Sequence, residues 1–279
     1  MKDLICDKEE ELYTFLRNNL KGSKNNIKSL LMKELVSVNN KVVTKYNYML
    51  KSGDKINVGA KSINNIKIIY EDKDILVVDK PCGILTIATE EDKYASNNLY
   101  EILLKYLKKK NSNSKLFVVH RLDKDTSGII LFSKNQLLQQ KLQDKWNDLA
   151  KRTYYAVVFG KTNEKDTIKS YLKENKNLIT LIDNKNNGKL AITEYKRIKY
   201  NEKFSLLEIN IKTGRRNQIR VQLKSIGHPI VGDSKYGKKD KNFKRMMLHA
   251  SKLEIINPIN NKTMIFNSPI DTEFKKMLK

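Results

Sequence analysis

The chain has 279 residues, with 55 Lys and Arg against 31 Asp and Glu, which gives a net charge of +24. Hydrophobic residues make up 39% of the sequence, enough for one or two domains with a packed core. No apolar run approaches the roughly 20 residues that a membrane span needs, and the N-terminus shows no signal-peptide apolar segment, so we expect a cytoplasmic protein without membrane contact.

The charge favours a polyanionic partner, and nucleic acid fits better than a membrane surface because no basic amphipathic helix stands out. The two cysteines, Cys6 and Cys82, indicate a reducing compartment and offer no metal-binding spacing. The three histidines lie far apart, and glycine motifs for nucleotide or dinucleotide phosphates are absent from the sequence. We therefore expect neither a metal nor another cofactor.

Residues 1–59 are predicted to form a small module. Apolar residues at helical spacing indicate one helix over residues 12–20 and a second that contains Ile27, Leu30 and Leu31. Two short strands around Asn39 and a turn before a closing strand over residues 55–58 complete the pattern.

This order of elements resembles the S4 RNA-binding module, through the segments FLRNNL, SLLMKELVSVNNKVV and SGDKINV. The resemblance implies that Lys21, Lys24 and Lys28 contact RNA phosphates without reading the bases. The alternative is an amphipathic helical cap with a solvated basic face.

Residues 60–66 are predicted to be a linker, and residues 67–279 to form an α+β domain with a mixed or antiparallel sheet. The predicted strands of this domain are residues 75–78, 154–158 and 207–211. The predicted helices carry Leu138, Leu142, Trp146 and Leu149 on one face, with Ser133 or Asn135 as the cap, and Ile219, Leu223 and Ile226 on another. Residues 108–115 are predicted to be a flexible basic tip.

The block His120-Arg121-Leu122-Asp123-Lys124-Asp125-Thr126-Ser127-Gly128 lies between two apolar runs. It is therefore predicted to be a polar loop held between two buried strands, where functional side chains are often presented. Asp123 is the strongest candidate for a catalytic carboxylate, and the alternative is that it caps the loop, as Asp beside Thr-Ser-Gly often does.

Two further motifs lie later in the chain: Lys151-Arg152-Thr153-Tyr154-Tyr155-Ala156-Val157-Val158 and Thr213-Gly214-Arg215-Arg216-Asn217-Gln218-Ile219-Arg220. Together with the HRLD block they resemble the catalytic motifs of the RluA-type RNA pseudouridine synthases. The segment VVDKPCGIL, which starts at Val77, and the blocks GHPIVGDSKYG and LHASKL, near the C-terminus, extend the resemblance over nearly the whole chain.

The resemblance implies a site-specific isomerisation of uridine to pseudouridine in structured RNA, most often large-subunit ribosomal RNA. Asp123 then acts as the catalytic carboxylate, Arg220 pairs with it, and Tyr154 stacks on the flipped base. Tyr155, on the opposite side of the strand, is expected in the core.

Further residues are expected to contact the RNA. Arg121 would fill the place of the flipped base, and His120 would either orient the loop or touch RNA. Arg215 and Arg216 supply planar donor groups, with Arg216 and Arg220 expected on one helix face. Lys80, in the turn that supports the floor of the site, is also predicted to bind RNA.

Two positions depart from the family pattern, since Asn217 and Gln222 stand where His is common. Asn can donate a hydrogen bond but cannot carry a charge. His249 is expected to satisfy buried polar groups.

Other functions compete with this reading. The nearest is a transfer RNA pseudouridine synthase, and the others are a non-catalytic RNA-binding or ribosome-assembly factor and a hydrolase using Asp123 with Asp125 and a metal. We expect a monomer.

Overall fold

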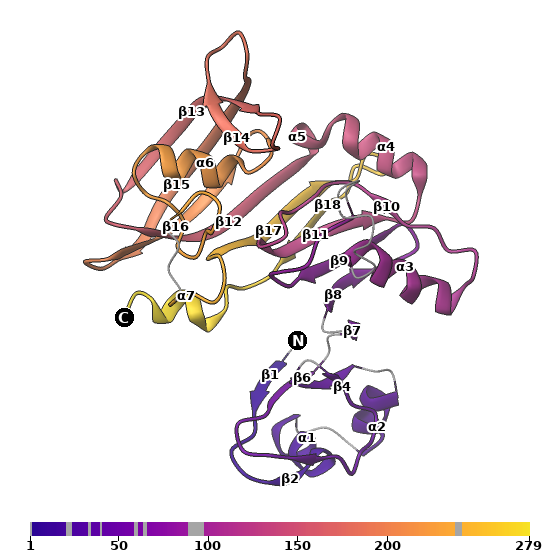
Figure 1. Cartoon of the computed structure of the whole chain (residues 1–279). Coiled ribbons are helices and arrows are strands. Elements are labelled where there is room, and N and C mark those ends of the chain that lie inside the picture. Colours follow the sequence, from indigo (N-terminus) through magenta and orange to yellow (C-terminus); the bar gives the residue numbers. More distant parts are fainter. Residues whose placement is uncertain are drawn as a thin grey trace.

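The computed structural model describes residues 2–20, 24–32, 35–39, 41–58, 61–63, 66–88, 98–237 and 242–279. A small N-terminal unit is joined through β7 to a larger unit that holds the rest of the chain (Figure 1). Within the described segments, no helix is both long and apolar enough to cross a membrane.

The N-terminal unit packs two helices and two small antiparallel sheets around its own apolar core. The helices are α1 (Leu12–Leu20) and α2 (Lys24–Met32). The four-stranded sheet has the order β1 (Lys2–Ile5), β6 (Lys55–Val58), β3 (Val36–Val38), β4 (Lys41–Val42), and β2 (Glu10–Glu11) pairs with β5 (Met49–Leu50). The core side chains include Leu12, Phe15, Leu16, Ile27, Leu31, Val36 and Ile56.

The segment predicted as a linker is partly regular structure. Strand β7 (Lys61–Ile63) pairs antiparallel with β8 (Ile66–Glu71), and both belong to the edge of the large sheet. The large unit therefore begins a few residues earlier than residue 67, because Ile66 is fully buried in its core.

The large unit is built on one long, twelve-stranded sheet within the described residues. Its main order is β14 (Thr180–Asp183), β13 (Lys165–Glu174), β15 (Lys189–Tyr200), β16 (Phe204–Ile211), β12 (Ala150–Phe159), β17 (Leu248–Ile256), β11 (Ser127–Ser133), β9 (Ile75–Lys80), β8, β7. Two short strands pair beside this path: β10 (Phe117–Val118) with β11, and β18 (Thr263–Asn267) with β17.

The sheet is mixed, as expected. Among the described strands all pairings are antiparallel except the one between β11 and β17, which is parallel and short: Ser127 faces His249 and Gly128 faces Ala250. Gly128 has a φ of +113°, and a Cβ there would overlap the backbone of Ala250, so only glycine allows the two strands to approach this closely.

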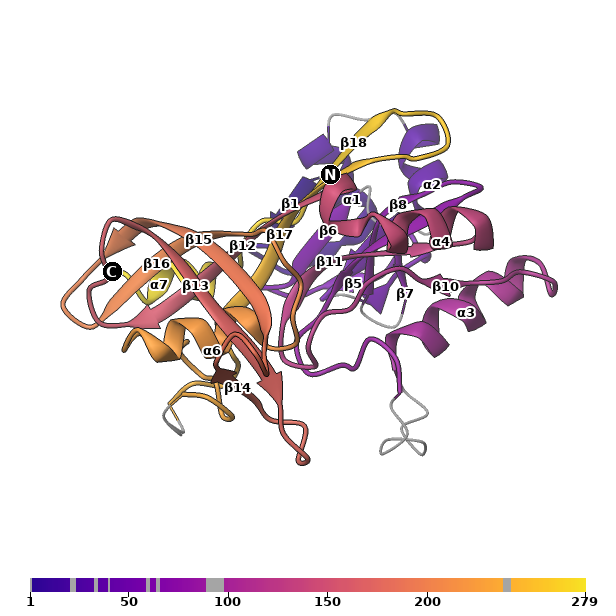
Figure 2. The same cartoon turned by 90° about the horizontal axis from the view of Figure 1, so that it is seen from above.

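Helices cover both faces of the sheet (Figure 2). Helix α3 (Leu99–Lys110) packs on the face that carries Leu76 and Ile130, whereas α4 (Gln136–Asp144) packs on the face that carries Val77 and Leu131. Helix α6 (Gln218–Ser225) contacts β13, β14 and β15, and α7 (Thr272–Lys276) adds Phe274 to the larger core. Strands β9 and β11 are thus buried on both faces, which explains their continuous apolar runs.

Two predicted helical features differ from the structure. The helix expected to include both Leu138 and Leu149 is interrupted at Lys145, and a separate short helix, α5 (Trp146–Leu149), follows; Asn135 caps α4 by accepting from the Leu138 N–H. The predicted basic tip begins inside α3, because residues 108–110 form the last turn of that helix.

Candidate active site

The loop between β10 and β11 is held at several points of its backbone. Leu122 is buried, and the Thr86 hydroxyl donates to its carbonyl oxygen (2.9 Å) and accepts from its N–H (3.3 Å). Farther along, the Gly83 N–H donates to the Lys124 carbonyl oxygen at 2.9 Å. These contacts fix the loop on both sides of Asp123, whose side chain keeps 28% of its surface exposed.

Lys80 supports the loop from below and does not meet RNA, so its assignment to the RNA-binding residues was wrong. It is fully buried, and its ammonium donates to the carbonyl oxygens of Pro81 (3.1 Å), Ile84 (2.8 Å) and Lys124 (2.9 Å). Burial lowers the pKa of Lys80 to about 8. A lysine gives the same sequence signal whether its ammonium meets water or three buried carbonyls.

The structure brings Asp123 and Arg220 together across 97 positions of sequence. Arg220 lies on α6, and its Nη1 donates to Asp123 Oδ2 at 3.1 Å. Asp123 Oδ1 accepts no hydrogen bond from any described residue. A buried guanidinium thus holds one oxygen of a carboxylate that is partly exposed.

Arg220 is itself fixed by a second carboxylate, Asp233, which the sequence analysis assigned no role. Its Nε and Nη2 donate to the two oxygens of Asp233 at 2.7 and 2.8 Å, and only 1% of the Asp233 side chain is exposed. Burial alone would raise the pKa of Asp233, but the bidentate pair with Arg220 outweighs it and lowers this pKa. Burial acts to lower the pKa of Arg220, but the two carboxylates outweigh the effect of burial and raise this pKa.

The atypical Asn217 completes the support of Arg220. It has a φ of +51° in the turn before α6, and its Oδ1 accepts from Arg220 Nη1 at 2.9 Å. Its Nδ2 donates to the Tyr236 hydroxyl at 3.2 Å, and the Tyr236 ring centroid lies 5.0 Å from the Arg220 guanidinium carbon. An uncharged amide that both accepts and donates therefore suits this position.

Tyr154 and Tyr155 project to opposite sides of β12. Tyr154 belongs to the larger core and is only 8% exposed. Burial raises the pKa of Tyr154, with a smaller contribution from the Asp123 charge, and the Arg152 charge acts against them. Tyr155 is half-buried, and its hydroxyl donates to Glu208 Oε2 at 2.7 Å; burial and this bond raise the pKa of Tyr155 to about 12.

Arg216 and Arg220 do not share a helix face, contrary to the prediction. The helix begins only at Gln218, and Arg216 Nη1 pairs with Glu174 Oε2 at 2.8 Å instead. Arg215 is exposed, and its Nε donates to the Leu190 carbonyl oxygen at 3.0 Å. Both arginines therefore lie beside the β13–β15 strands.

His120 and Arg121 have different surroundings. His120 stacks on Trp146 with a centroid distance of 4.5 Å, and its Nε2 accepts from the Leu131 N–H at 3.0 Å. Burial, with a smaller contribution from Arg152, lowers the pKa of His120 to about 3. This favours the loop-orienting alternative. Arg121 is exposed and makes no hydrogen bond or ion pair with the residues the structure describes.

A buried polar chain supports the end of the loop. The Ser127 hydroxyl lies 2.8 Å from His249 Nδ1, and His249 Nε2 lies 3.0 Å from the Ser268 carbonyl oxygen. The Ser268 hydroxyl donates to Asp79 Oδ2 at 2.7 Å. His249 thus connects the end of the loop that carries Asp123 to the neighbouring strands.

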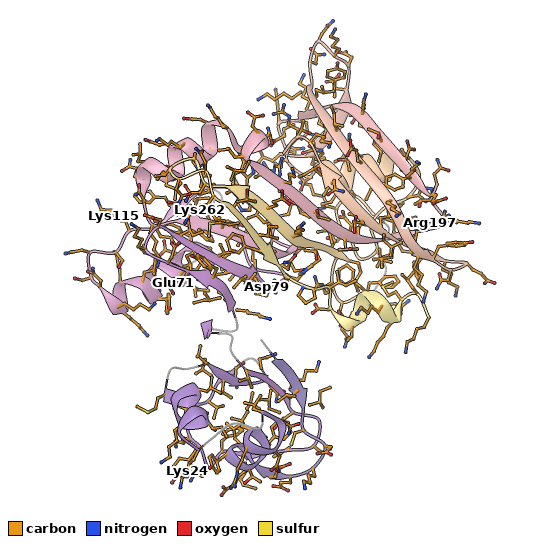
Figure 3. The ribbon with its side chains drawn as sticks, turned by 180° about the vertical axis from the view of Figure 1, so that it is seen from behind. Lys24, Glu71, Asp79, Lys115, Arg197 and Lys262 are labelled. Atoms are coloured by element: carbon orange, nitrogen blue, oxygen red, sulfur yellow. The ribbon has the colours of Figure 1, made fainter. Side chains whose placement is uncertain are left out.

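The basic residues of the N-terminal unit lie far from Asp123 along the chain. Lys24 and Lys28 are exposed on α2, and Lys24 lies at the far end of this unit (Figure 3). Lys21 lies outside the described residues.

The site offers a fixed carboxylate paired with a buried guanidinium, and β12 carries a buried phenol. In the described part of the chain, no three His, Cys, Asp or Glu side chains are grouped to hold a metal ion. Such a carboxylate can act as a nucleophile or as a general base.

Comparison with known proteins places this geometry in context. Residues 74–225 match the family model described as RNA pseudouridylate synthase. A Bacillus subtilis protein named "Uncharacterized RNA pseudouridine synthase YhcT" is 33% identical over 99% of this chain and 95% of its own length. A Rickettsia bellii protein named "Ribosomal large subunit pseudouridine synthase C" is 36% identical over 78% of this chain and 73% of its own. The solved structure of human RNA Pseudouridylate Synthase Domain Containing 1 shares the fold, with a TM-score of 0.62, 24% identity and coverage of 75% of this chain and 85% of that one.

Proposed function

The chain belongs to the RluA-type RNA pseudouridine synthases and isomerises uridine in RNA, and from this premise we propose that large-subunit ribosomal RNA is its substrate. The names of relatives that act on the large ribosomal subunit support this substrate, as does the net charge of +24. Transfer RNA is the alternative.

Asp123 is the proposed catalytic carboxylate, and the observation that carries this assignment is its fixed pairing with Arg220 at 3.1 Å. The reaction breaks the bond between N1 and C1′, turns the uracil, joins C5 to C1′, and moves the C5 proton away while N1 gains one. Asp123 Oδ1 could attack the sugar, add to the base or remove the C2′ proton, and each route needs a placed carboxylate.

Tyr154 is proposed to stack on the uracil and to assist removal of the C5 proton. The target uridine must leave the RNA helix to reach these groups. Arg121, exposed beside Asp123 and without a described partner, is proposed to stack in the place of the missing base.

Residues 1–59 are proposed to act as an S4-like RNA-binding module that raises the local concentration of structured RNA near the site. Its two helices beside short strands and the exposed Lys24 and Lys28 support this assignment. Because Asp123, Tyr154 and Arg220 all come from one chain, we propose that a monomer is active, and that it acts on RNA in the cytoplasm.

Tritium release tests the catalytic assignment. RNA labelled with tritium at uridine C5 should lose the label with the wild-type protein, and Asp123→Asn should reduce the rate by about 10²-fold or more while RNA binding survives. Asp125→Asn removes the same charge two residues away and should stay close to wild type. Near-wild-type activity of Asp123→Asn would contradict the assignment.

Pseudouridine mapping tests the substrate. Cells that lack this gene should lose pseudouridine from the large-subunit ribosomal RNA. Loss from transfer RNA alone would replace the proposed substrate with the alternative.

A further inference from the structure

Arg152, on β12, is a buried cation that the mechanism above does not use. Only 7% of the residue is exposed, and its Nη2 donates to Asn147 Oδ1 at 2.8 Å. Its Nε is buried and has no hydrogen-bond partner. No described acidic side chain forms an ion pair with it.

This arrangement is unfavourable for the free protein. A guanidinium removed from water normally needs a carboxylate or several acceptors, and Arg220 has both. Burial lowers the pKa of Arg152, in contrast to that of Arg220. The structure therefore maintains a positive charge for which it supplies only one neutral acceptor.

The position of Arg152 connects it to the active site. It lies two residues before Tyr154 on the same strand, and its charge lowers the pKa of Tyr154 against the effect of burial. From another side, a Cβ on Gly214 would lie 2.9 Å from Arg152 Nη1. The glycine of the TGR motif thus lets the loop before α6 close over the guanidinium.

We propose that Arg152 binds a backbone phosphate of the target uridine. The uracil would lie against Tyr154, the sugar would face Asp123, and the phosphate would meet the unused donors of Arg152. Phosphate fits because it is the anion that every RNA substrate brings, and because a guanidinium presents several donors to it. This inference rests on the proposed function, since it needs a nucleotide in the site.

Lys151 provides a matched control on the same strand. Its side chain is 83% exposed and pairs with Glu254 at 3.1 Å, so Lys151→Met removes the same charge away from the site. Arg152→Lys keeps the charge and tests whether charge alone restores binding.

The first measurement is thermal unfolding without RNA. Arg152→Met should raise the melting temperature by about 3 °C or more, because the unpaired buried charge is removed and the exposed Asn147 can bond to water. Lys151→Met should leave it nearly unchanged. A lower melting temperature for Arg152→Met would show that the residue is structural and would overturn the proposal.

The second measurement is RNA affinity as a function of salt, made in the Asp123→Asn background so that no turnover occurs. A ribosomal RNA fragment that contains the mapped uridine should bind Arg152→Met about tenfold more weakly, and the slope of log affinity against log salt should fall by roughly 0.7 to 0.9. Arg152→Lys should keep the slope. An unchanged slope for Arg152→Met, or an equal change for Lys151→Met, would overturn the proposal.

A neutral methylphosphonate then locates the phosphate. Placed on one side of the target uridine, it should weaken binding to the protein with Arg152 about tenfold and have little further effect on Arg152→Met. Equal losses in both proteins at both flanking positions would overturn the proposal. Because binding and unfolding need no catalysis, these results are independent of tritium release, whose absence in the wild type would overturn the proposed function instead.

Discussion

Arg220 holds two carboxylates, and the deeper one, Asp233, is too buried to meet a substrate. Asp233 also accepts the backbone N–H groups of Lys235 and Tyr236, both at 2.9 Å. It therefore sets the position of the guanidinium, and through it the position of Asp123. We infer that Asp233 is a positioning residue.

Replacing Asp233 tests this role. Asp233→Asn leaves Arg220 with a single charged partner, and we expect the free energy of unfolding to fall by about 3 kcal/mol or more. The turnover rate should fall as well, with KM changed much less, since the RNA contacts are intact. Asp271→Asn is the control, because Asp271 pairs with Arg245 at 2.9 Å but is 61% exposed. A stable Asp233→Asn variant with wild-type turnover would contradict the role.

The sequence predicted part of this site. Asp123, Tyr154 and Arg220 follow from motif resemblance, and the ion pair between Asp123 and Arg220 has the expected partners. Asp233 was missed because an Asp next to Gly232 is typical of a turn. Lys80 was misassigned for a related reason: residue type does not reveal the depth of a side chain.

At the level of elements, Glu71 joins three parts of the larger unit. It ends β8, and its carboxylate meets Lys110 of α3 (2.9 Å), Lys134 after β11 (2.9 Å) and the Tyr106 hydroxyl (2.7 Å). Burial alone would raise the pKa of Glu71, but these three donors outweigh it and lower this pKa to about 2.

The acid stability of the protein should depend on this cluster. Because the pKa of Glu71 is lower in the folded chain, its stabilisation is full above about pH 4.5 and is lost as the pH falls toward 2. Glu71→Gln should reduce the free energy of unfolding at pH 7 by on the order of 2 to 3 kcal/mol. In urea titrations the gap to wild type should close between pH 4.5 and 2.

Glu194→Gln provides the control for this change. Its ion pair with Lys212, at 3.2 Å, is more than 40% exposed on both sides and should contribute little. A gap between Glu71→Gln and wild type that stayed constant with pH would show that the carboxylate charge is not the cause.

Some strands of the large sheet were predicted from the sequence and others were not. Strands β9, β12 and β16 carry strong apolar patterns and were found, whereas β13, β14 and β15 received no assignment. In β13 and β15 charged and polar residues interrupt the few apolar ones, so the strand signal is weak until the neighbouring strands supply the pairing. The break between α4 and α5 at Lys145 has no Pro or Gly that would signal it in the sequence.

At the scale of the whole molecule, the positive charge is spread over both units. Figure 3 shows Lys24 on the N-terminal unit and Lys262 on the large one, at distant places on the surface. Lys24 and Lys28 are one helical turn apart on α2 and therefore share a face.

The salt dependence of RNA binding can distinguish a direct contact of α2 with RNA from attraction by the net charge of the protein. If α2 meets RNA phosphates, Lys24→Gln and Lys28→Gln should each lower the salt slope of binding by roughly 0.7 to 0.9. Lys262→Gln removes an equal charge and should change the slope less. Equal effects at all three positions would indicate attraction by net charge without a specific contact of α2.

The short parallel pairing of β11 with β17 bears on how this enzyme can fail. Asp123 lies in the loop before β11, whereas Tyr154 lies on β12 and Arg220 on α6, and only two residue pairs join β11 to β17. The proposed catalytic side chains therefore come from both sides of this short pairing. A bulkier residue at Gly128 would force β11 and β17 apart. The proposed catalytic side chains would then be displaced although each remained chemically intact, and activity would be lost.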